Sequence, residues 1–280
     1  MNKAERPAAT AGTTFKEWLV RVQFSLLRRL LATLPPADRA RVQSAFTQQF
    51  LTETHTVETP AGAISFVLLG RTSAGRATTI LTKQPATIRW IDGFRPDGVF
   101  WDIGANVGVY SLYAARRGIA HVVAFEPAAI NYFLLAANCE ANGLEACIDS
   151  LLLGVGEDRA MAHLEVSQFA SAKSFSFRSH PGRTHTSRQP ALVLSIDRLI
   201  DEFGLRCPTY IKIDTPGMSE AVIAGGQRTF QKGGVREIHM ELRESKAGQR
   251  ITRMLERCGF TLAARDVHGG TSDVTFARQD

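Results

Sequence analysis

From Val99 onward, short apolar runs rich in β-branched residues alternate with segments whose apolar residues recur at helical spacing. Strands that alternate with helices build βαβ units, whose strands form a mostly parallel sheet covered by helices. The alternation therefore predicts an α/β fold. The predicted strands are Val99–Ile103, His121–Phe125, Ser150–Val155, Tyr210–Ile213 and Val235–Met240, and the predicted helices are Tyr110–Arg117, Asn131–Asn142, Ser195–Phe203, Ser219–Phe230 and Ala247–Cys258.

The end of the chain breaks this alternation. Two predicted strands, Phe260–Ala264 and Asp273–Ala277, are separated only by a short segment that contains Gly269-Gly270. Because so short a connection joins antiparallel strands, one of the two must run against the rest of the sheet, at or near its edge. We take this α/β part as one domain, residues 96–280, which begins at the Pro96-Asp97-Gly98 turn.

Residues 1–95 differ in character and are predicted to form an N-terminal extension. Apolar and basic residues alternate at helical spacing over 15–34, which indicates a basic amphipathic helix, and Asp38–Leu51 is predicted to form a shorter helix. Ile64–Leu69 and Thr78–Leu81 are predicted to form a small strand pair. The helix over 15–34 is expected to pack on its own domain, and peripheral contact with a membrane or a partner is the alternative.

The composition is that of a globular protein, with 44% hydrophobic and 21% charged residues among 280. The net charge of +6 is concentrated in residues 1–95, which hold 13 Lys/Arg and 6 Asp/Glu. This excess could attract an anionic partner, but no RNA-binding motif accompanies it, so a nucleic-acid partner is not expected. Four scattered cysteines and charged residues within the first thirty positions favour a cytoplasmic protein without a signal peptide.

The segment Asp102-Ile103-Gly104-Ala105-Asn106-Val107-Gly108 follows the first strand of the α/β part. At this point of an open parallel sheet a ligand binds beyond the carboxyl ends of the strands. Gly104 and Gly108 permit a tight turn, whereas Asn106 stands where a dinucleotide motif needs its second glycine. Asp102 would repel a phosphate but suits the ammonium group of an amino acid. The loop is thus predicted to bind something other than NAD.

A second acid narrows the choice of ligand. Glu126 ends the second strand at the distance from Gly104 that is typical of the acid that holds a ribose diol. A nucleoside that carries an amino acid meets both requirements, and S-adenosylmethionine is such a molecule. The predicted cofactor-binding residues are Asp102, Gly104, Asn106, Gly108, Glu126, the adjacent Pro127, and Gly154 and Val155 in the loop expected near the adenine.

Three segments together resemble the FkbM family of S-adenosylmethionine-dependent methyltransferases. They are Phe100–Ser111, Ala124-Phe125-Glu126-Pro127 and Ile211-Lys212-Ile213-Asp214, and the resemblance extends over about residues 80–245. It implies a Rossmann-like class I methyltransferase fold with a seven-stranded sheet. It also implies O-methylation of a hydroxyl on a glycan or a small-molecule natural product.

The acceptor side departs from the family pattern. Asp214 is the first candidate for the base that takes the hydroxyl proton, and Glu241, after the Val235–Met240 strand, is the second. Family members usually carry another acid two residues after the position of Asp214, where this chain has Pro216. The alternative is therefore a catalytically impaired binding protein that keeps the nucleoside pocket.

Other groups near the acceptor are harder to assign from sequence. Asp214 could instead cap the next helix, Glu241 could pair with Arg243 or Lys246, and Arg178, Arg183 and Arg188 could hold an anionic acceptor. No cluster of histidines with ligand spacing is present, so no tightly bound metal is expected.

Overall fold

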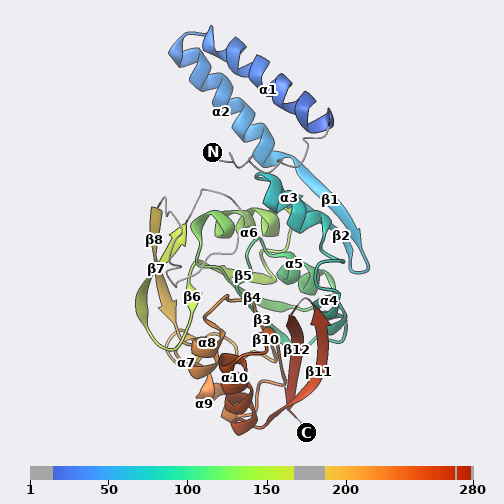
Figure 1. The fold of residues 1–280 in the computed structure, drawn as a ribbon, viewed down its shortest axis with the longest axis vertical. Coiled ribbons are helices and arrows are strands. Elements are labelled where there is room, and N and C mark those ends of the chain that lie inside the picture. The colour runs from blue at the N-terminus through green and yellow to red at the C-terminus, as the bar shows by residue number, and fades with distance from the viewer. Residues whose placement is uncertain (1–14, 167–186, 269, 279–280) are drawn as a thin grey trace, which may run out of the picture. The chain divides into compact units, whose positions relative to one another are not determined.

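The computed structural model describes residues 15–166, 187–268 and 270–278, which divide into two compact units, Met1–Thr52 and Glu53–Asp280 (Figure 1). Segment 53–95, which the sequence analysis placed in the N-terminal extension, is grouped with the second unit. No helix among the described residues has the length and apolar content needed to cross a bilayer.

The first unit consists of two helices, α1 (Phe15–Ala32) and α2 (Pro36–Thr52), where the sequence predicts them. A short turn at Thr33–Pro35 separates them because proline cannot continue the α1 hydrogen-bond ladder. The Arg39 guanidinium donates to the carbonyl oxygens of Ala32 and Leu34, both at 3.0 Å, and so satisfies carbonyl groups at the end of α1.

The second unit begins with a hairpin of β1 (Thr54–Thr59) and β2 (Gly62–Val67). The prediction of a strand at Thr78–Leu81 is wrong, because Thr78 ends helix α3 (Arg71–Thr78) and the following residues form turns. The threonines bond locally here: Thr79 Oγ1 donates to the Gly75 carbonyl oxygen at 2.6 Å. Such side-chain bonds to nearby backbone favour a helix end over a strand. Helix α4 (Pro85–Asp92) follows.

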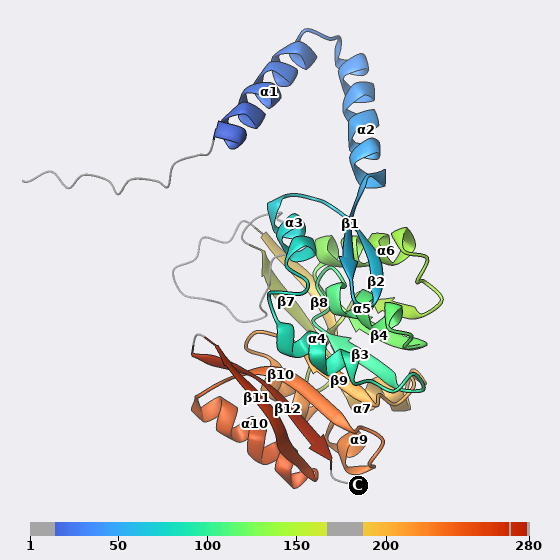
Figure 2. The ribbon, with the colours of Figure 1, turned by 90° about the vertical axis from the view of Figure 1, so that its right-hand side faces the viewer.

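The main sheet has seven strands in the order β11-β12-β10-β9-β3-β4-β5 (Figures 1 and 2). Of these, β12 alone runs opposite to the other six strands, which confirms the predicted C-terminal hairpin and the mostly parallel sheet. The strands are β3 (Val99–Ile103), β4 (His121–Phe125), β5 (Ile148–Leu151), β9 (Tyr210–Ile213), β10 (Glu237–Arg243), β11 (Phe260–His268) and β12 (Thr271–Arg278).

Alternate residues of the central strands pack on opposite faces of the sheet. Trp101, Ile103 and Ile211 belong to the large apolar core that α7–α10 help to form, whereas the intervening Asp102 and Lys212 face α5 on the other side. The helices are α5 (Val109–Arg116), α6 (Ala129–Ala141), α7 (Ile196–Asp201), α8 (Ser219–Ala224), α9 (Gln227–Gln231) and α10 (Lys246–Arg257).

One predicted helix and one predicted strand are each divided. Gly225-Gly226 separates α8 from α9, and a Cβ at Gly225 would lie 2.8 Å from the Ser195 Cβ, so the backbone approaches a neighbour too closely for a side chain. The predicted strand 150–155 becomes the end of β5 and a separate β6 (Gly154–Val155).

A second, three-stranded sheet has the order β6-β8-β7, with β7 (Ala160–Val166) antiparallel to β8 (Ser187–Leu194). Segment 167–186 between them is outside the described residues, and so are Arg178 and Arg183. Arg188, the third predicted acceptor contact, lies exposed on β8.

Candidate active site at the carboxyl edge of the sheet

The loop after β3 has three residues in left-handed backbone conformations. Gly104 has φ 87°, Asn106 φ 56° and Gly108 φ 84°, and Gly108 begins α5. Asparagine tolerates the left-handed region better than most residues, because its side chain can hydrogen-bond to the nearby backbone. Here Asn106 Oδ1 accepts from the Val107 N–H at 3.1 Å. This loop is the one that the sequence assigns to the cofactor.

Hydrogen bonds fix the loop to the end of β4. The N–H groups of Gly104 and Ala105 both donate to the Phe125 carbonyl oxygen, at 2.9 and 3.0 Å. The Asn106 N–H donates to Glu126 Oε2 at 2.9 Å. The loop and the second predicted cofactor acid are therefore held together before any ligand binds.

Gly104 also approaches the strand on its other side. A Cβ there would lie 2.9 Å from the Asp214 carbonyl carbon and closer still to its oxygen, and φ is positive. We expect Gly104→Ala to lower the free energy of unfolding by at least about 1–3 kcal/mol, since strain and a backbone clash add. Urea unfolding measures this. Gly118→Ala, also at positive φ but in open space, controls for conformation, and an equal loss in both variants would contradict the close approach.

Glu126 is 6% exposed and its carboxylate has three donors. Oε1 accepts from the Ala128 N–H at 2.8 Å and from Asn131 Nδ2 at 3.5 Å, and Oε2 accepts from Asn106. Burial raises the pKa of Glu126 to about 7, although the hydrogen bonds oppose this shift. A carboxylate can accept about four hydrogen bonds. The Glu126 carboxylate can therefore accept one more hydrogen bond, from a hydroxyl group.

Asp102 and Lys212 form a buried ion pair on neighbouring strands. Asp102 is fully buried and Lys212 is 3% exposed, and Lys212 Nζ lies 3.4 Å from Asp102 Oδ1. The Ser111 hydroxyl of α5 donates to Asp102 Oδ2 at 2.8 Å. Both oxygens of Asp102 therefore have protein partners, and the role of this residue as the ligand of an ammonium group stays a prediction.

The same row of the sheet continues with polar residues. Lys212 is opposite His239, and His239 is opposite Thr275. The buried His239 ring bonds to Thr87 Oγ1 at 3.0 Å and to Thr275 Oγ1 at 2.9 Å, and Trp90 stacks on it at 4.7 Å. Burial, with a contribution from Lys212, lowers the pKa of His239 to about 3, so the ring is a neutral structural group.

A second row lies two residues further along the strands, and its members after β9 and on β10, β12 and β11 are all acids. Asp214 follows β9, Glu241 is opposite Asp273 in the β10–β12 register, and Asp273 is opposite Asp266 in β11–β12. Asp214 Oδ2 lies 3.7 Å from Lys212 Nζ, and its side chain is 32% exposed. Asp214 thus contacts the buried row through Lys212 and is also accessible to solvent at the edge of the sheet.

Lys83 lies near both predicted catalytic acids. Partial burial lowers its pKa and Arg76 adds to this effect, whereas Asp214 and Glu241 act in the opposite direction. Glu241 is exposed and has no ion pair with Arg243 or Lys246 among the described residues. Asp214 and Glu241 therefore belong to one acidic edge that includes a nearby cation.

The remaining predicted cofactor residues lie on other segments. Pro127 follows Glu126 directly, and its carbonyl oxygen accepts from Gln189 Nε2 at 2.7 Å. Gly154 and Val155 are buried in β6, where they pair with Val193 and Leu194 of the second sheet. Their proximity to an adenine stays a prediction.

Several site residues escaped the sequence analysis. Lys212 was part of a quoted motif without a role, and Asp273 and His268 were treated only as part of a strand pair and its turn. The signal was present for Lys212, because a lysine between isoleucines in a fully apolar strand must have a buried partner. For Asp273 and His268 the signal was absent, since it depends on the register of β12.

The order of the sheet, its one antiparallel strand and the glycine loop after β3 define a class I methyltransferase with a Rossmann-like fold. The family model described as the methyltransferase FkbM domain matches residues 102–262, more than half of the chain. The chain therefore belongs to the FkbM methyltransferase family. None of the curated proteins matches the sequence.

The solved structures that match the chain have low sequence identity and TM-scores below 0.5. Methyltransferase FkbM from Methylobacillus flagellatus KT is 17% identical with a TM-score of 0.44, and the match covers 86% of this chain and 60% of that one. A precorrin-6y C5,15-methyltransferase from Geobacter metallireducens is 15% identical (TM-score 0.44; 72% and 93% covered). TYW2 from M. jannaschii, solved in complex with AdoMet, is 12% identical (TM-score 0.41; 81% and 87% covered).

Proposed function

We propose that the protein transfers the methyl group of S-adenosylmethionine to a hydroxyl oxygen of a glycan or a small natural product. One observation carries this proposal: the backbone of the predicted base Asp214 touches the glycine loop at Gly104, so that a Cβ would not fit between them. A cofactor on this loop and an acceptor at Asp214 would therefore be neighbours, as methyl transfer requires.

The residues present suit such a cofactor. Glu126 retains acceptor capacity for the ribose hydroxyls, and the loop backbone is already fixed by Phe125 and Glu126. The Thr215 hydroxyl beside Asp214 is buried and has no hydrogen-bond partner in the described part of the chain, which leaves a polar group available at the junction. The bound sulfonium would supply an activated methyl group.

In the reaction proposed here, the hydroxyl oxygen forms a bond to the methyl carbon as the bond from carbon to sulfur breaks. The electron pair of that bond returns to sulfur, and S-adenosylhomocysteine leaves. The hydroxyl proton passes to the Asp214 carboxylate and then to water. Lys212, 3.7 Å from Asp214 and 3.4 Å from Asp102, positions the base relative to the loop.

The alternative is a binding protein without turnover. It is favoured by the sequence Asp214-Thr215-Pro216-Gly217, in which proline replaces a family acid. A panel of hydroxyl-bearing acceptors, with S-adenosylhomocysteine release as the readout, distinguishes the two. Release that depends on an added acceptor supports the enzyme, whereas cofactor binding without release for any acceptor supports the alternative.

Cofactor affinity should depend on pH through Glu126. Burial raises the pKa of Glu126 from 4.5 to about 7. Between these two pH values the carboxyl group is therefore mostly protonated in the folded protein and mostly ionised in the unfolded chain. Because ribose hydroxyls donate best to the ionised form, we expect S-adenosylhomocysteine to bind about tenfold more tightly at about pH 8 than at about pH 6. This contribution is lost as the pH falls through 7.

Titration calorimetry at the two pH values in buffers of different ionisation enthalpy checks this prediction. At about pH 6 the wild-type protein should release a proton on binding. Glu126→Gln cannot titrate and should show the same affinity at both values. An equally steep pH dependence in Glu126→Gln would assign the titration to another group.

A further inference from the structure

Three side chains of potential metal-ligand type meet at the outer end of the acidic row. Glu241 of β10, His268 of β11 and Asp273 of β12 each offer one ligand atom, and these atoms lie within 4.8 Å of one another. Glu241 and His268 are exposed, whereas Asp273 is 4% exposed. The set is therefore open to solvent on one side and closed on the other.

Asp273 is a buried carboxylate with little positive charge close to it in the described part of the chain. In the part of the chain that the structure describes, no donor hydrogen-bonds to its carboxylate, and its one ion-pair partner is His268, with Nε2 at 3.8 Å from Oδ1. Its cross-strand neighbours Glu241 and Asp266 are also acids, and like charges directly opposite destabilise a sheet. A buried carboxylate in this setting requires a positive partner.

The basic residues nearby are mostly engaged elsewhere. Arg89 binds Asp266 at 3.0 Å, and Arg265 binds Glu244 at 2.7 Å. Lys212 acts on Asp273 only at a distance and pairs with Asp102 and Asp214. Lys83 acts on Glu241 but forms no ion pair with it or with Asp273, so no lysine or arginine in the described part of the chain pairs with these two carboxylates.

We propose that Glu241, His268 and Asp273 bind a divalent first-row transition metal ion such as Mn²⁺ or Zn²⁺. Two carboxylates and one imidazole suit these ions, whereas Mg²⁺ and Ca²⁺ prefer sets of oxygen ligands. The expectation of no metal rested on the lack of a histidine cluster, but this set is mixed and is assembled only by strand pairing. Binding of the ion does not depend on the proposed methyl transfer.

The test is titration of the chelator-treated, tag-free full chain with Mn²⁺ alone, with free Mn²⁺ followed by electron paramagnetic resonance. We expect one site per chain, displacement by Zn²⁺ and no displacement by a tenfold excess of Mg²⁺. Glu241→Gln, His268→Ala and Asp273→Asn should each weaken binding about tenfold or more. The controls His163→Ala, an exposed histidine on β7, and Glu244→Gln should bind as the wild type does.

Circular dichroism verifies that each variant is folded, and Asp273→Asn should be at least as stable as the wild type in the absence of metal. Three results would overturn the proposal: no bound Mn²⁺, binding that the three substitutions leave unchanged, or equal displacement by Mg²⁺. Because no cofactor or acceptor is added, a failure to bind Mn²⁺ does not contradict the proposed methyl transfer. A failure to transfer methyl groups does not contradict the metal site either.

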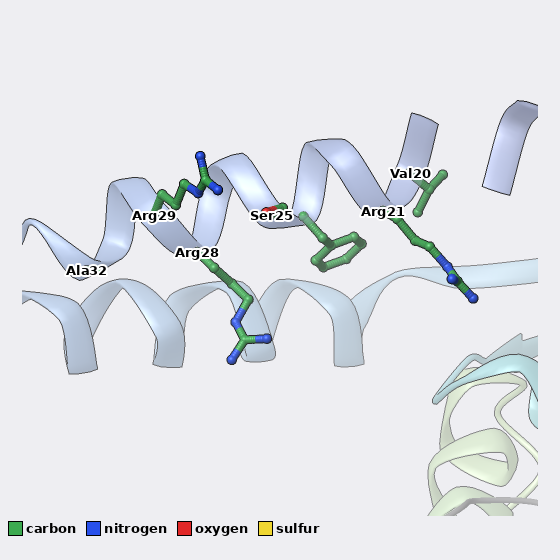
Figure 3. Close-up of a pocket in the computed structure, with 7 residues that line it drawn as sticks. Val20, Arg21, Ser25, Arg28, Arg29 and Ala32 are labelled. Atoms are coloured by element: carbon green, nitrogen blue, oxygen red, sulfur yellow. The ribbon is translucent and has the colours of Figure 1, made fainter. Parts of the chain in front are cut away.

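A separate observation concerns the first unit. Six apolar side chains of α1 are exposed: Leu19 by 41%, Val20 by 49%, Phe24 and Leu26 by 56%, Leu27 by 36% and Leu30 by 69%. At about 100° per residue they cover nearly half of the helix circumference. Arg21, Ser25, Arg28 and Arg29 occupy the remaining positions and, together with Val20 and Phe24, line a shallow hollow (Figure 3). An apolar surface this large marks an interaction site.

We infer that α1 lies in the interface of an anionic phospholipid membrane. The charge of the unit favours this occupant, because residues 15–52 contain six basic and only two acidic side chains. Exposed apolar side chains over nearly half of a helix, with arginines at the other positions, are the pattern of helices that lie in the headgroup region. Figure 3 shows Arg28 and Arg29 extending to different sides of α1.

Co-sedimentation of the full chain with vesicles tests this inference. We expect binding to vesicles of phosphatidylcholine and phosphatidylglycerol, none to phosphatidylcholine alone, and weaker binding as salt rises from about 0.1 to about 1 M. Leu26→Glu with Leu30→Glu should abolish binding. The control Leu152→Glu with Leu262→Glu changes two leucines of the second unit that are each 49% exposed, and it should not abolish binding.

The apolar side of α1 could instead be covered by a second copy of the chain or by the rest of the same chain. Light scattering of the protein without vesicles shows whether a second copy covers α1. A stable dimer that the Leu26→Glu, Leu30→Glu variant dissociates, together with no vesicle binding, would overturn the inference. A monomer that ignores anionic vesicles would overturn it equally.

Discussion

Asp214→Asn is expected to lower the turnover of the cofactor-saturated enzyme by about 10²–10⁴-fold, the usual contribution of a positioned base. The amide keeps the shape of the side chain and cannot take a proton. Asp214 Oδ2 is 3.7 Å from Lys212, and the side chain is one-third exposed, so the substitution should leave the fold and the glycine loop in place. Initial rates of S-adenosylhomocysteine release measure the effect.

Cofactor affinity separates this role from a structural one. Asp214→Asn should bind S-adenosylhomocysteine as the wild type does, because the contact with Gly104 is made by the main chain of Asp214. Glu244→Gln, an exposed carboxylate paired with Arg265, is the control and should retain full turnover. If Asp214→Asn loses cofactor affinity and keeps its turnover at saturation, Asp214 serves the cofactor and is not the base.

Lys212→Met should lower the free energy of unfolding by about 3–5 kcal/mol, because it leaves the fully buried Asp102 without its cation. Ser111 would still donate to Asp102 Oδ2, but one hydrogen bond does not replace the ion pair. Urea unfolding followed by circular dichroism gives the value. Arg250→Met removes the exposed ion pair with Glu220 and should lose less than about 1 kcal/mol.

The double variant Asp102→Asn, Lys212→Met tests the pairing itself. Because it removes both charges, it should be more stable than the sum of the two single losses predicts. The coupling should be strong, since 3.4 Å and near-complete burial of both groups leave little water to screen them. Additive losses, or a loss in Lys212→Met no larger than that in Arg250→Met, would show that the pair does not stabilise the sheet.

The sequence predicted the parts of the fold that depend on local pattern. The alternation after Val99 located most strands and helices of the main sheet, and the short connection at Gly270 fixed the antiparallel strand. Local pattern failed at Thr78–Leu81 and at Gly225-Gly226. There the outcome depends on side-chain bonds to nearby carbonyl groups and on close backbone contact.

The sequence predicted individual site residues at the ends of strands, but it did not predict how these residues are arranged across the sheet. The order of residues places Asp102, Glu126 and Asp214 at strand ends, which is enough to expect them at one edge. The buried row from Asp102 to Thr275 and the acidic row beside it exist only once β9, β10 and β12 are in register. Burial of Glu126 is likewise a property of the packed loop, so its raised pKa could not be read from sequence.

The central claim is that the loop from Gly104 to Gly108 and the Glu126 carboxylate hold an aminoacyl nucleoside, and calorimetric titration of the purified chain with S-adenosylhomocysteine tests it most directly. We predict one site per chain with a dissociation constant between about 1 μM and 1 mM, and binding weakened about 10- to 100-fold in Glu126→Gln, which loses charge-assisted hydrogen bonds to the ribose. A folded protein that takes up neither S-adenosylhomocysteine nor S-adenosylmethionine at millimolar concentration, or a Glu126→Gln variant that binds as tightly as the wild type, would contradict it.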